Sequence, residues 1–250
     1  MSYSKKLIEA LHRARSVCVL TGAGVSAESG VPTFRGDDGL WKKFKPEELA
    51  NFDSFIRNPE LVWEWYSYRK KVVKEVKPNP AHYALVELQK LVPEFTLVTQ
   101  NVDNLHRRAG STGVLELHGN IERSYCIDCK EREDDVWVDA SRKVPLCKRC
   151  GGLIRPDVVW FGEFLPPDTF ARAEWAAGHC DVFLSVGTSA VVYPAASLPL
   201  AALNNGAYVV EINQEYTDLS SRVQETILGK AGVILPAIVQ ALHAPRNQSL

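Results

Sequence analysis

Near its amino terminus the chain reads Val17-Cys18-Val19-Leu20-Thr21-Gly22-Ala23-Gly24-Val25-Ser26-Ala27. The four apolar residues predict a buried strand, and the residues after them form a G-x-G-x-x-A loop ahead of a short helix, which is the context of a dinucleotide-binding site. Gly22 permits a tight turn, and Gly24 lets the backbone approach a pyrophosphate at the amino end of the helix. The stretch therefore predicts an α/β fold that binds a nucleotide.

Further short runs along the chain are rich in β-forming residues. Most are continuously apolar, which is typical of strands that helices cover on both faces. Helical patterns such as Ala81–Leu91 and Ala195–Leu203 lie between them. The sequence therefore predicts a doubly wound parallel Rossmann-type sheet. Its six expected strands are Val17–Leu20, Phe95–Val98, Val114–Leu117, Val182–Val186, Tyr208–Ile212 and Val233–Leu235.

Two stretches do not follow this alternation of strands and helices. Residues 36–78 are rich in aromatic residues and favour helices, and residues 121–157 contain four of the six cysteines. We interpret both as insertions that fold together into a smaller lobe, made of a helical module and a zinc-binding module. The large domain would then consist of residues 1–35, 79–120 and 158–250.

The four cysteines form two C-x-x-C pairs separated by 17 residues. This spacing is typical of a four-thiolate zinc site. Four thiolates close a tetrahedron around the metal and leave no open position, so we expect one structural zinc per chain. Two redox dithiols or two disulfides are the alternatives, but neither pair opens a thioredoxin-like unit. The expected zinc ligands are Cys126, Cys129, Cys147 and Cys150.

Composition limits the possible environments and partners. The chain has 250 residues, 46% of them hydrophobic, and a formal net charge of −1. This is enough for a sizeable core, and no global basic field points to nucleic acid or a membrane surface. We recognise no signal peptide and no membrane span. Cys18 and Cys180 adjoin apolar stretches, and we expect buried thiols, a cytoplasmic location and a monomer.

The glycine loop departs from that of an ordinary dehydrogenase. Such an enzyme carries an acidic residue about twenty residues further on, at the end of a second strand, to hold a ribose. Here the chain continues as Glu28-Ser29-Gly30-Val31-Pro32-Thr33-Phe34-Arg35-Gly36, which has no strand character. We therefore expect the nucleotide to be held differently, and the dehydrogenase interpretation does not account for the cysteines.

Polar loops follow the other expected strands. The carboxyl ends of parallel strands meet at one edge of the sheet, where open α/β sheets bind their ligands. We therefore expect these loops to converge on one site. They are Thr99-Gln-Asn-Val-Asp-Asn-Leu-His106, Leu117-His-Gly-Asn120, Gly187-Thr-Ser189 and Asn213.

In the order in which they occur along the chain, the glycine loop, the polar loops and the cysteine pairs resemble the sirtuins, which are NAD-consuming protein-lysine deacylases. The resemblance spans essentially the whole chain. It implies a Rossmann-type large domain and a small lobe, with NAD and acyl-lysine meeting between them. It also implies that the segment Val159, Trp160, Phe161, Gly162 and Glu163 pairs with the peptide substrate as an added strand.

The resemblance assigns the NAD-binding residues in three groups. The diphosphate and the nicotinamide ribose would be surrounded by Gly22, Ala23, Gly24, Ser26, Thr33, Phe34, Arg35 and Trp41. The nicotinamide pocket would be formed by Gln100, Asn101, Val102 and Asp103, with Asn101 also catalytic. The adenosine side would be formed by Gly187, Thr188, Ser189, Asn213, Gln214, Glu215 and Ala231.

The implied reaction is not a redox reaction. The acyl-lysine oxygen attacks the ribose carbon that carries nicotinamide, and the acyl group then migrates to the ribose. The products are lysine, nicotinamide and O-acyl-ADP-ribose, so NAD is a consumed substrate. His118 matches the general base, and a histidine with a pKa near 6.5 can accept a proton at neutral pH.

A Y-x-x-R pattern in the expected helical module bears on the acyl group. Tyr66 and Arg69 would lie on one helix face, where a guanidinium fork and a phenol can bind a carboxylate. The pattern resembles the sirtuins that remove succinyl, malonyl and glutaryl groups, some of which also remove acetyl. The alternative is a packed aromatic beside the solvated basic run Arg69-Lys70-Lys71.

Two other functions are compatible with parts of the sequence. Some proteins that resemble sirtuins are NAD-dependent mono-ADP-ribosyltransferases. A zinc ribbon that binds nucleic acid is the second, but basic residues between the cysteine pairs are offset by acidic ones and form no phosphate-binding stripe. We therefore expect no nucleic-acid partner.

Overall fold

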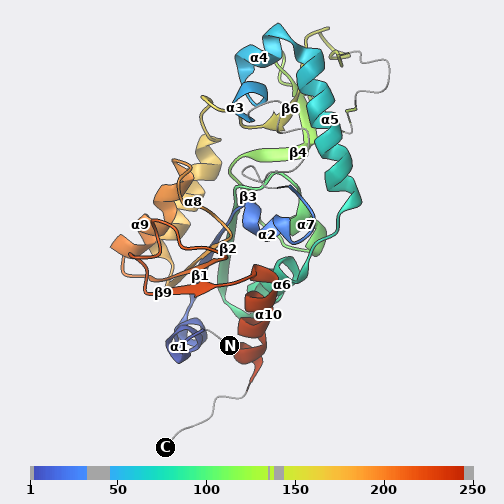
Figure 1. Cartoon of the computed structure of the whole chain (residues 1–250). Helices are drawn as coiled ribbons and strands as arrows, with labels where there is room; N and C mark the ends of the chain where they lie inside the picture. The colour runs from blue at the N-terminus through green and yellow to red at the C-terminus, as the bar shows by residue number, and fades with distance from the viewer. Residues whose placement is uncertain (1–2, 33–45, 135, 138–143, 245–250) are drawn as a thin grey trace, which may run out of the picture.

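The computed structural model describes residues 3–32, 46–134, 136–137 and 144–244. Within these residues six parallel strands form a sheet in the order β3-β2-β1-β7-β8-β9 (Figure 1). The chain leaves β1 toward β2 on one side and later returns to β7 on the other, so the connections diverge between β1 and β7. The strands are β1 (Ser16–Thr21), β2 (Glu94–Thr99), β3 (Leu115–Glu116), β7 (Val182–Val186), β8 (Tyr208–Asn213) and β9 (Glu225–Leu228).

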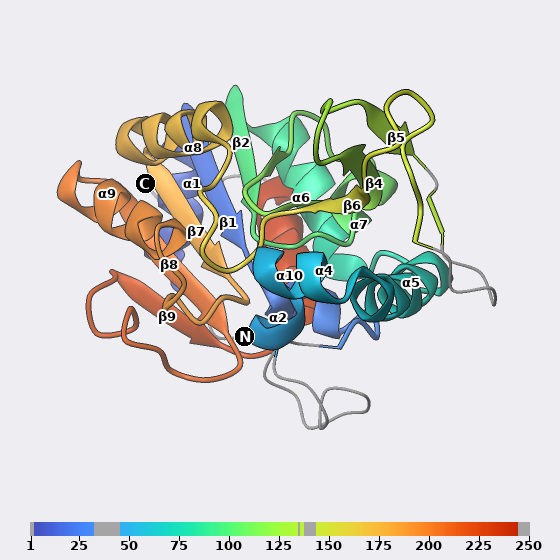
Figure 2. The same cartoon turned by 90° about the horizontal axis from the view of Figure 1, so that it is seen from above.

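Helices cover both faces of this sheet, as Figure 2 shows from above. In β1, Val17 and Val19 pack toward α1, α6 and α10, while Cys18 and Leu20 pack toward α8 and α9. Successive side chains of a strand point to opposite faces, so a strand buried on both faces is apolar throughout. These helices are α1 (Lys5–Arg13), α6 (Pro80–Leu91), α8 (Pro167–His179), α9 (Leu198–Asn204) and α10 (Ala231–His243), with the 3-10 turn η2 (Ala195–Ser197) before α9.

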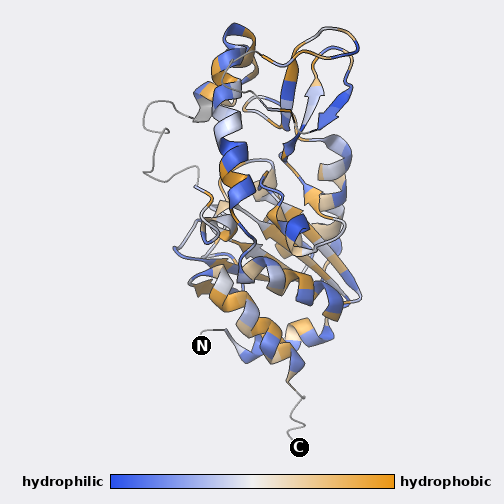
Figure 3. Cartoon of the chain, turned by 90° about the vertical axis from the view of Figure 1, so that its right-hand side faces the viewer, coloured by the Kyte–Doolittle hydropathy of each residue, from blue (hydrophilic) through white to orange (hydrophobic). Residues whose placement is uncertain are grey.

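A second group of elements lies above the sheet in Figure 1. An antiparallel sheet in the order β5-β4-β6 packs with α4 and α5 around a separate cluster of buried residues that includes Phe55, Trp63 and Trp160. The elements are α3 (Pro46–Leu49), α4 (Phe52–Arg57), α5 (Pro59–Glu75), β4 (Gly119–Cys126), β5 (Arg132–Asp134) and β6 (Ile154–Val158). Figure 3 shows that hydrophobic residues are frequent in the lower half of the molecule, which holds the six-stranded sheet.

The expected fold class is confirmed, but one predicted strand is wrong. Val233–Leu235 lies inside α10, and the sixth strand is β9. A short apolar run does not distinguish a strand from a buried helix, and α10 buries Ile234, Leu235 and Ile238. β9 escaped detection because it is an edge strand in which only Ile227 is fully buried. The buried state expected for Cys18 and Cys180 is confirmed.

The remaining elements are two short helices near the carboxyl edge of the sheet. They are α2 (Ala23–Ala27), which follows β1, and α7 (Leu105–Ala109), which follows β2. No helix in the described part of the chain is long and apolar enough to cross a membrane.

Candidate functional site

The four cysteines of the two C-x-x-C pairs come together beside β4. Their sulfur atoms lie within 4.8 Å of one another, with Cys126 Sγ 3.5 Å from Cys150 Sγ and Cys129 Sγ 3.6 Å from Cys147 Sγ. A tetrahedron with Zn–S bonds of about 2.3 Å has sulfur–sulfur edges of about 3.8 Å. All four are free thiols. The cluster therefore fits a structural zinc ion.

The glycine loop after β1 packs directly against the loop after β7. The backbone N–H of Gly24 donates to the carbonyl of Gly187 at 2.8 Å. A Cβ at Gly24 would lie 2.8 Å from Gly187 Cα, and one at Gly22 would lie 2.7 Å from the carbonyl oxygen of Gly187. Gly187 itself has a φ of +59°. The contact between the two loops thus requires these three glycines, whatever ligand approaches them.

The loop after β2 joins this assembly through two side-chain amides. Asn101 Nδ2 donates to the carbonyl of Gly22 at 3.0 Å and to Ser26 Oγ at 3.1 Å. Gln100 Nε2 donates to Thr188 Oγ1 at 2.8 Å. The polar loops after β1, β2 and β7 therefore converge at the edge where the sequence placed them.

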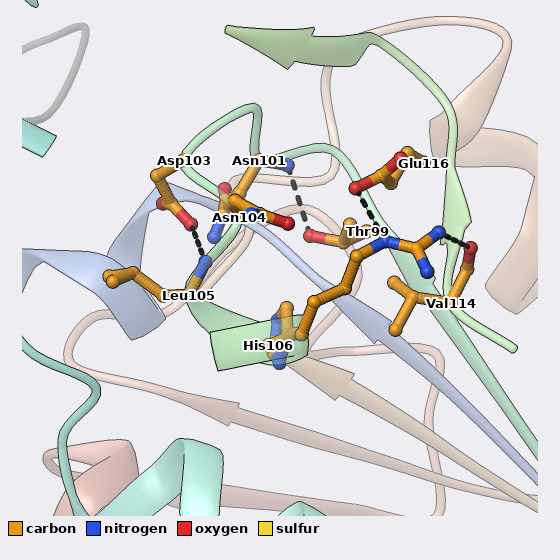
Figure 4. A pocket seen from close by; sticks show the side chains of 9 residues that line it. Thr99, Asn101, Asp103, Asn104, Leu105, His106, Val114 and Glu116 are labelled. Carbon is orange, nitrogen blue, oxygen red and sulfur yellow. Dashed lines mark hydrogen bonds and ion pairs between the residues drawn. The ribbon is translucent and has the colours of Figure 1, made fainter. Parts of the chain in front are cut away.

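Asp103 lies buried in the same loop. Desolvation raises the pKa of its carboxyl, against the effects of a hydrogen bond from Ser26, one from the backbone N–H of Leu105, and the charge of Arg69. The Leu105 bond is 2.9 Å long and begins α7 (Figure 4). Val102, next to it, packs with the cluster around Trp63. Asp103 thus links the loop after β2 to the glycine loop and to α5.

His118 lies between β3 and β4, and one of its ring nitrogens is already hydrogen-bonded within the protein. Its Nδ1 is 2.9 Å from the carbonyl oxygen of Gln100. A carbonyl only accepts, so Nδ1 carries the hydrogen and the lone pair of the neutral ring is on Nε2. Burial lowers the pKa of His118 below 6.5, while the bond to Gln100 raises it. The ring is therefore neutral and available as a base at neutral pH.

The backbone next to His118 is fixed by its surroundings. Gly119 has a φ of +79°, and a Cβ there would lie 2.1 Å from the carbonyl oxygen of Asp157, so only glycine fits. Glu116 accepts hydrogen bonds from Arg107 Nε at 3.0 Å, shown in Figure 4, and from Asn120 Nδ2 at 2.8 Å. These contacts hold the residues on both sides of the imidazole.

The residues expected on the adenosine side lie around the ends of β7 and β8. Asn213 Nδ2 donates to the carbonyl of Thr188 at 3.0 Å, which ties the two strand ends together. Ser189 is half-buried beside them, and Gln214 and Glu215 are exposed. Ala231 is the buried first residue of α10.

Tyr66 and Arg69 lie one turn apart on α5. Arg69 Cζ is 5.6 Å from the centroid of the Tyr66 ring and 4.8 Å from that of Trp65. Burial lowers the pKa of Arg69, while Tyr66 and Asp103 raise it. Trp160 Nε1 donates to Tyr66 Oη at 2.7 Å. Because Tyr66 Oη accepts this bond, its own hydrogen is left to donate.

The segment after β6 holds the five residues assigned to peptide binding. Val159 is already bonded to His118 through its backbone N–H, and that of Phe161 to Ala50. None of the five is in a strand of the structure. Phe161 and Gly162 are exposed.

Sequence reasoning missed Arg155, which organises this segment. Arg155 is 2% exposed, and its guanidinium binds Glu163 through both terminal nitrogens and lies 3.4 Å from the Trp160 ring centroid. Glu163 in turn accepts from the backbone N–H of Trp160. The strand Ile154–Val158 reads Ile-Arg-Pro-Asp-Val, and the arginine between Ile154 and Pro156 was the available signal. Four predicted cofactor-binding residues, Thr33, Phe34, Arg35 and Trp41, lie outside the described residues.

These features define a nucleotide-binding α/β protein of the Rossmann type that carries a separate four-thiolate metal site. The model of the Sir2 family matches residues 22–194. This is more than half of the chain, so the protein belongs to the Sir2 family, and the resemblance to sirtuins is confirmed.

Relatives and solved structures agree with this assignment. The chain is 52% identical over 228 residues to an NAD-dependent protein deacylase of Aquifex aeolicus, covering 91% of this chain and 95% of that one. It is 49% identical over 238 residues to an NAD-dependent protein deacylase of Pyrococcus furiosus, covering 93% and 95%. A Sir2 homologue–NAD complex superposes with a TM-score of 0.91 at 45% identity, covering 96% and 93%. A Sir2–p53 peptide–NAD+ complex superposes with a TM-score of 0.85 at 34% identity, covering 94% and 97%.

Proposed function

We propose that this protein is an NAD-dependent protein-lysine deacylase. The observation that carries the proposal is His118, whose Nδ1 bond to Gln100 leaves Nε2 as the base within the loops that converge at the carboxyl edge of the sheet. Relatives of about 50% identity are named NAD-dependent protein deacylases, and a structural neighbour holds NAD.

In this reaction NAD is a substrate that is consumed. The acyl-lysine oxygen attacks the ribose carbon that carries nicotinamide, and the bond to nicotinamide breaks. His118 Nε2 then takes a proton from a ribose hydroxyl, which attacks the acyl carbon. The bond between the acyl carbon and the lysine nitrogen then breaks, and one water adds at the acyl carbon. The products are free lysine, nicotinamide and O-acyl-ADP-ribose.

The loop after β2 would orient NAD for this attack. Asn101 is fixed by its two side-chain hydrogen bonds to the glycine loop, and its position next to Gln100 brings it close to the base. Holding two reacting groups in the correct geometry is worth several kcal/mol of the activation barrier. We therefore assign Asn101 to the nicotinamide end of the substrate, as its likeness to the sirtuin motif implies.

We further propose that acidic acyl groups are preferred. The support is the pair of Tyr66, whose hydroxyl accepts from Trp160 and keeps its own hydrogen to donate, and Arg69, which lies beside it. A carboxylate of a succinyl, malonyl or glutaryl group could accept from both, and such charge-assisted bonds are about twice as strong as neutral ones. An acetyl group has no carboxylate for them to bind.

Zinc would be held by the four cysteines and would stabilise the turns that carry them. All four coordination positions are filled by protein sulfurs, so its contribution is to folding.

One assay tests both proposals. Nicotinamide release from NAD is measured with succinyl-, malonyl- and acetyl-lysine versions of one peptide, and the freed lysine is quantified by mass. Equal yields of nicotinamide and lysine are expected, with faster turnover of the acidic acyl groups. Radiolabel from NAD that remains covalently on protein would instead indicate mono-ADP-ribosyl transfer, and would overturn the deacylase proposal.

A further inference from the structure

Two histidines that take no part in the proposed reaction lie buried beneath the site. His82, in α6, is 0% exposed, and His106, in α7, is 2% exposed. Their ring centroids are 4.8 Å apart. Burial lowers the pKa of His82 to about 4 and that of His106 to about 3. Both rings are therefore neutral at neutral pH, and each carries one N–H.

The hydrogen bonds of His106 run toward the end of β1. His106 Nε2 lies 2.9 Å from Thr21 Oγ1, which lies 2.8 Å from Thr99 Oγ1 at the end of β2. Thr21 has a single hydroxyl hydrogen and donates it to Thr99. It must therefore accept from His106, so the hydrogen of His106 is on Nε2.

This chain of bonds ends at Asn101. The backbone N–H of Asn101 donates to Thr99 Oγ1 at 3.0 Å (Figure 4). Its side chain donates to the carbonyl of Gly22. Thr99 is 2% exposed and Thr21 is fully buried, so water does not replace these contacts. Asn101 is thereby held at its backbone from below and at its side chain from the glycine loop.

We propose that His106, Thr21 and Thr99 form a positioning relay that fixes Asn101 for NAD. The relay rests on the proposed function, because it acts through a residue assigned to NAD. The parallel ladder between β1 and β2 already pairs Thr21 with Thr99 through their backbones. The hydroxyls are therefore not needed to pair the strands, and what they add is the connection from His106 to the Asn101 backbone.

The test compares Thr21→Val with Thr21→Ser. Valine keeps the shape of threonine and loses the hydroxyl, whereas serine keeps the hydroxyl. NAD affinity is measured by calorimetry, and kcat/KM for NAD is measured by nicotinamide release with an acetyl-lysine peptide. A small displacement of a positioning group can lower rates by about 100-fold, so we expect Thr21→Val to lower kcat/KM by about 10- to 100-fold. Thr21→Ser should stay within about threefold of the wild type by the same reasoning.

The losses should appear in the affinity for NAD and in kcat/KM for NAD, with the KM for the peptide unchanged. A double-mutant cycle with Thr99→Val sharpens the test, because members of one relay are not additive. The double variant should lose no more than the worse single variant. Additive losses in the double variant, or a Thr21→Ser variant as impaired as Thr21→Val, would overturn the proposal of a relay.

A second pair of variants and a wild-type measurement make the outcome decisive. If Thr21→Val does not fold, Thr99→Val against Thr99→Ser makes the same comparison. A wild type that binds NAD but releases no nicotinamide with acyl-lysine peptides would refute the proposed reaction. The calorimetric series at Thr21 would still decide whether the relay positions the NAD site.

Discussion

Replacing Arg69 with methionine isolates the charge that we assign to acyl recognition. Arg69 is half-buried on α5, with its guanidinium 4.8 Å from the Trp65 ring centroid and 5.6 Å from that of Tyr66. Methionine has an apolar side chain of similar length to the stem of arginine and removes the guanidinium. The change should therefore affect substrates that carry a carboxylate and spare those that do not.

The magnitude follows from the burial of the pair. Losing one partner of a desolvated, hydrogen-bonded charge pair costs about 2–5 kcal/mol. Arg69 is only half-buried and Tyr66 would remain as a donor, so we expect the lower part of that range, about 2–3.5 kcal/mol. At about 1.4 kcal/mol per tenfold change, desuccinylation should fall about 30- to 300-fold in kcat/KM. The loss should appear mainly in KM if the carboxylate is bound equally in the ground and transition states.

The assay measures kcat/KM on matched succinyl- and acetyl-lysine peptides at saturating NAD. Lys71→Met is the matched control, because it removes a cation from an exposed position two residues further along α5. It should change neither activity by more than about threefold, as exposed charges contribute little. Equal losses of both activities in Arg69→Met would mean that Arg69 supports the packing of α5, and the acidic-acyl proposal would fall.

Three further predictions concern zinc, the base and acid stability. Cys147→Ala should lose the zinc, and with it folding free energy and activity; a zinc-free protein with an unchanged thermal midpoint would contradict this. His118→Ala should lower deacylation by about 10²- to 10⁴-fold with unchanged zinc content, and since the pKa of His118 is lowered, the wild-type rate should fall with decreasing pH only below about pH 6.5. His82 and His106 stay neutral in the fold but gain protons near pH 6.5 when unfolded, so the free energy of unfolding should fall by up to about 2.7 kcal/mol per pH unit between about pH 6 and 4. Denaturant titrations at several pH values should show that the free energy of unfolding of His106→Gln depends less steeply on pH than that of the wild type. An identical pH dependence would refute the assignment of the effect to these histidines.

The sequence predicted the parts of the fold that depend on short patterns of neighbouring residues. The parallel sheet was evident because strands buried on both faces, such as Val182–Val186, are apolar throughout. The same criterion misassigned Val233–Leu235, because a helix packed inside the core is equally apolar. The cysteine cluster was predictable because the metal requires its spacing.

The support beneath the site could not be predicted in this way. His106 and Thr21 are 85 residues apart and bond because α7 lies under the end of β1. Nothing in the residues around either one signals that contact. Arg155 does have a local signal, its charge between Ile154 and Pro156, but its partner Glu163 is identified only by the turn that follows β6.

The glycines of the opening loop show why a correct prediction can rest on an incomplete reason. The sequence suggests that Gly24 is required for close approach of a pyrophosphate, yet its absent side chain is already required by Gly187, 2.8 Å from where a Cβ would stand. A Gly24→Ala variant that lost NAD binding would therefore not demonstrate a ligand contact, because the two loops would separate first. Thr21→Val leaves this packing intact and removes only a hydroxyl. Variants that conserve shape, rather than substitutions of the motif glycines, are thus the ones that can separate recognition of NAD from the packing of the loops that hold it.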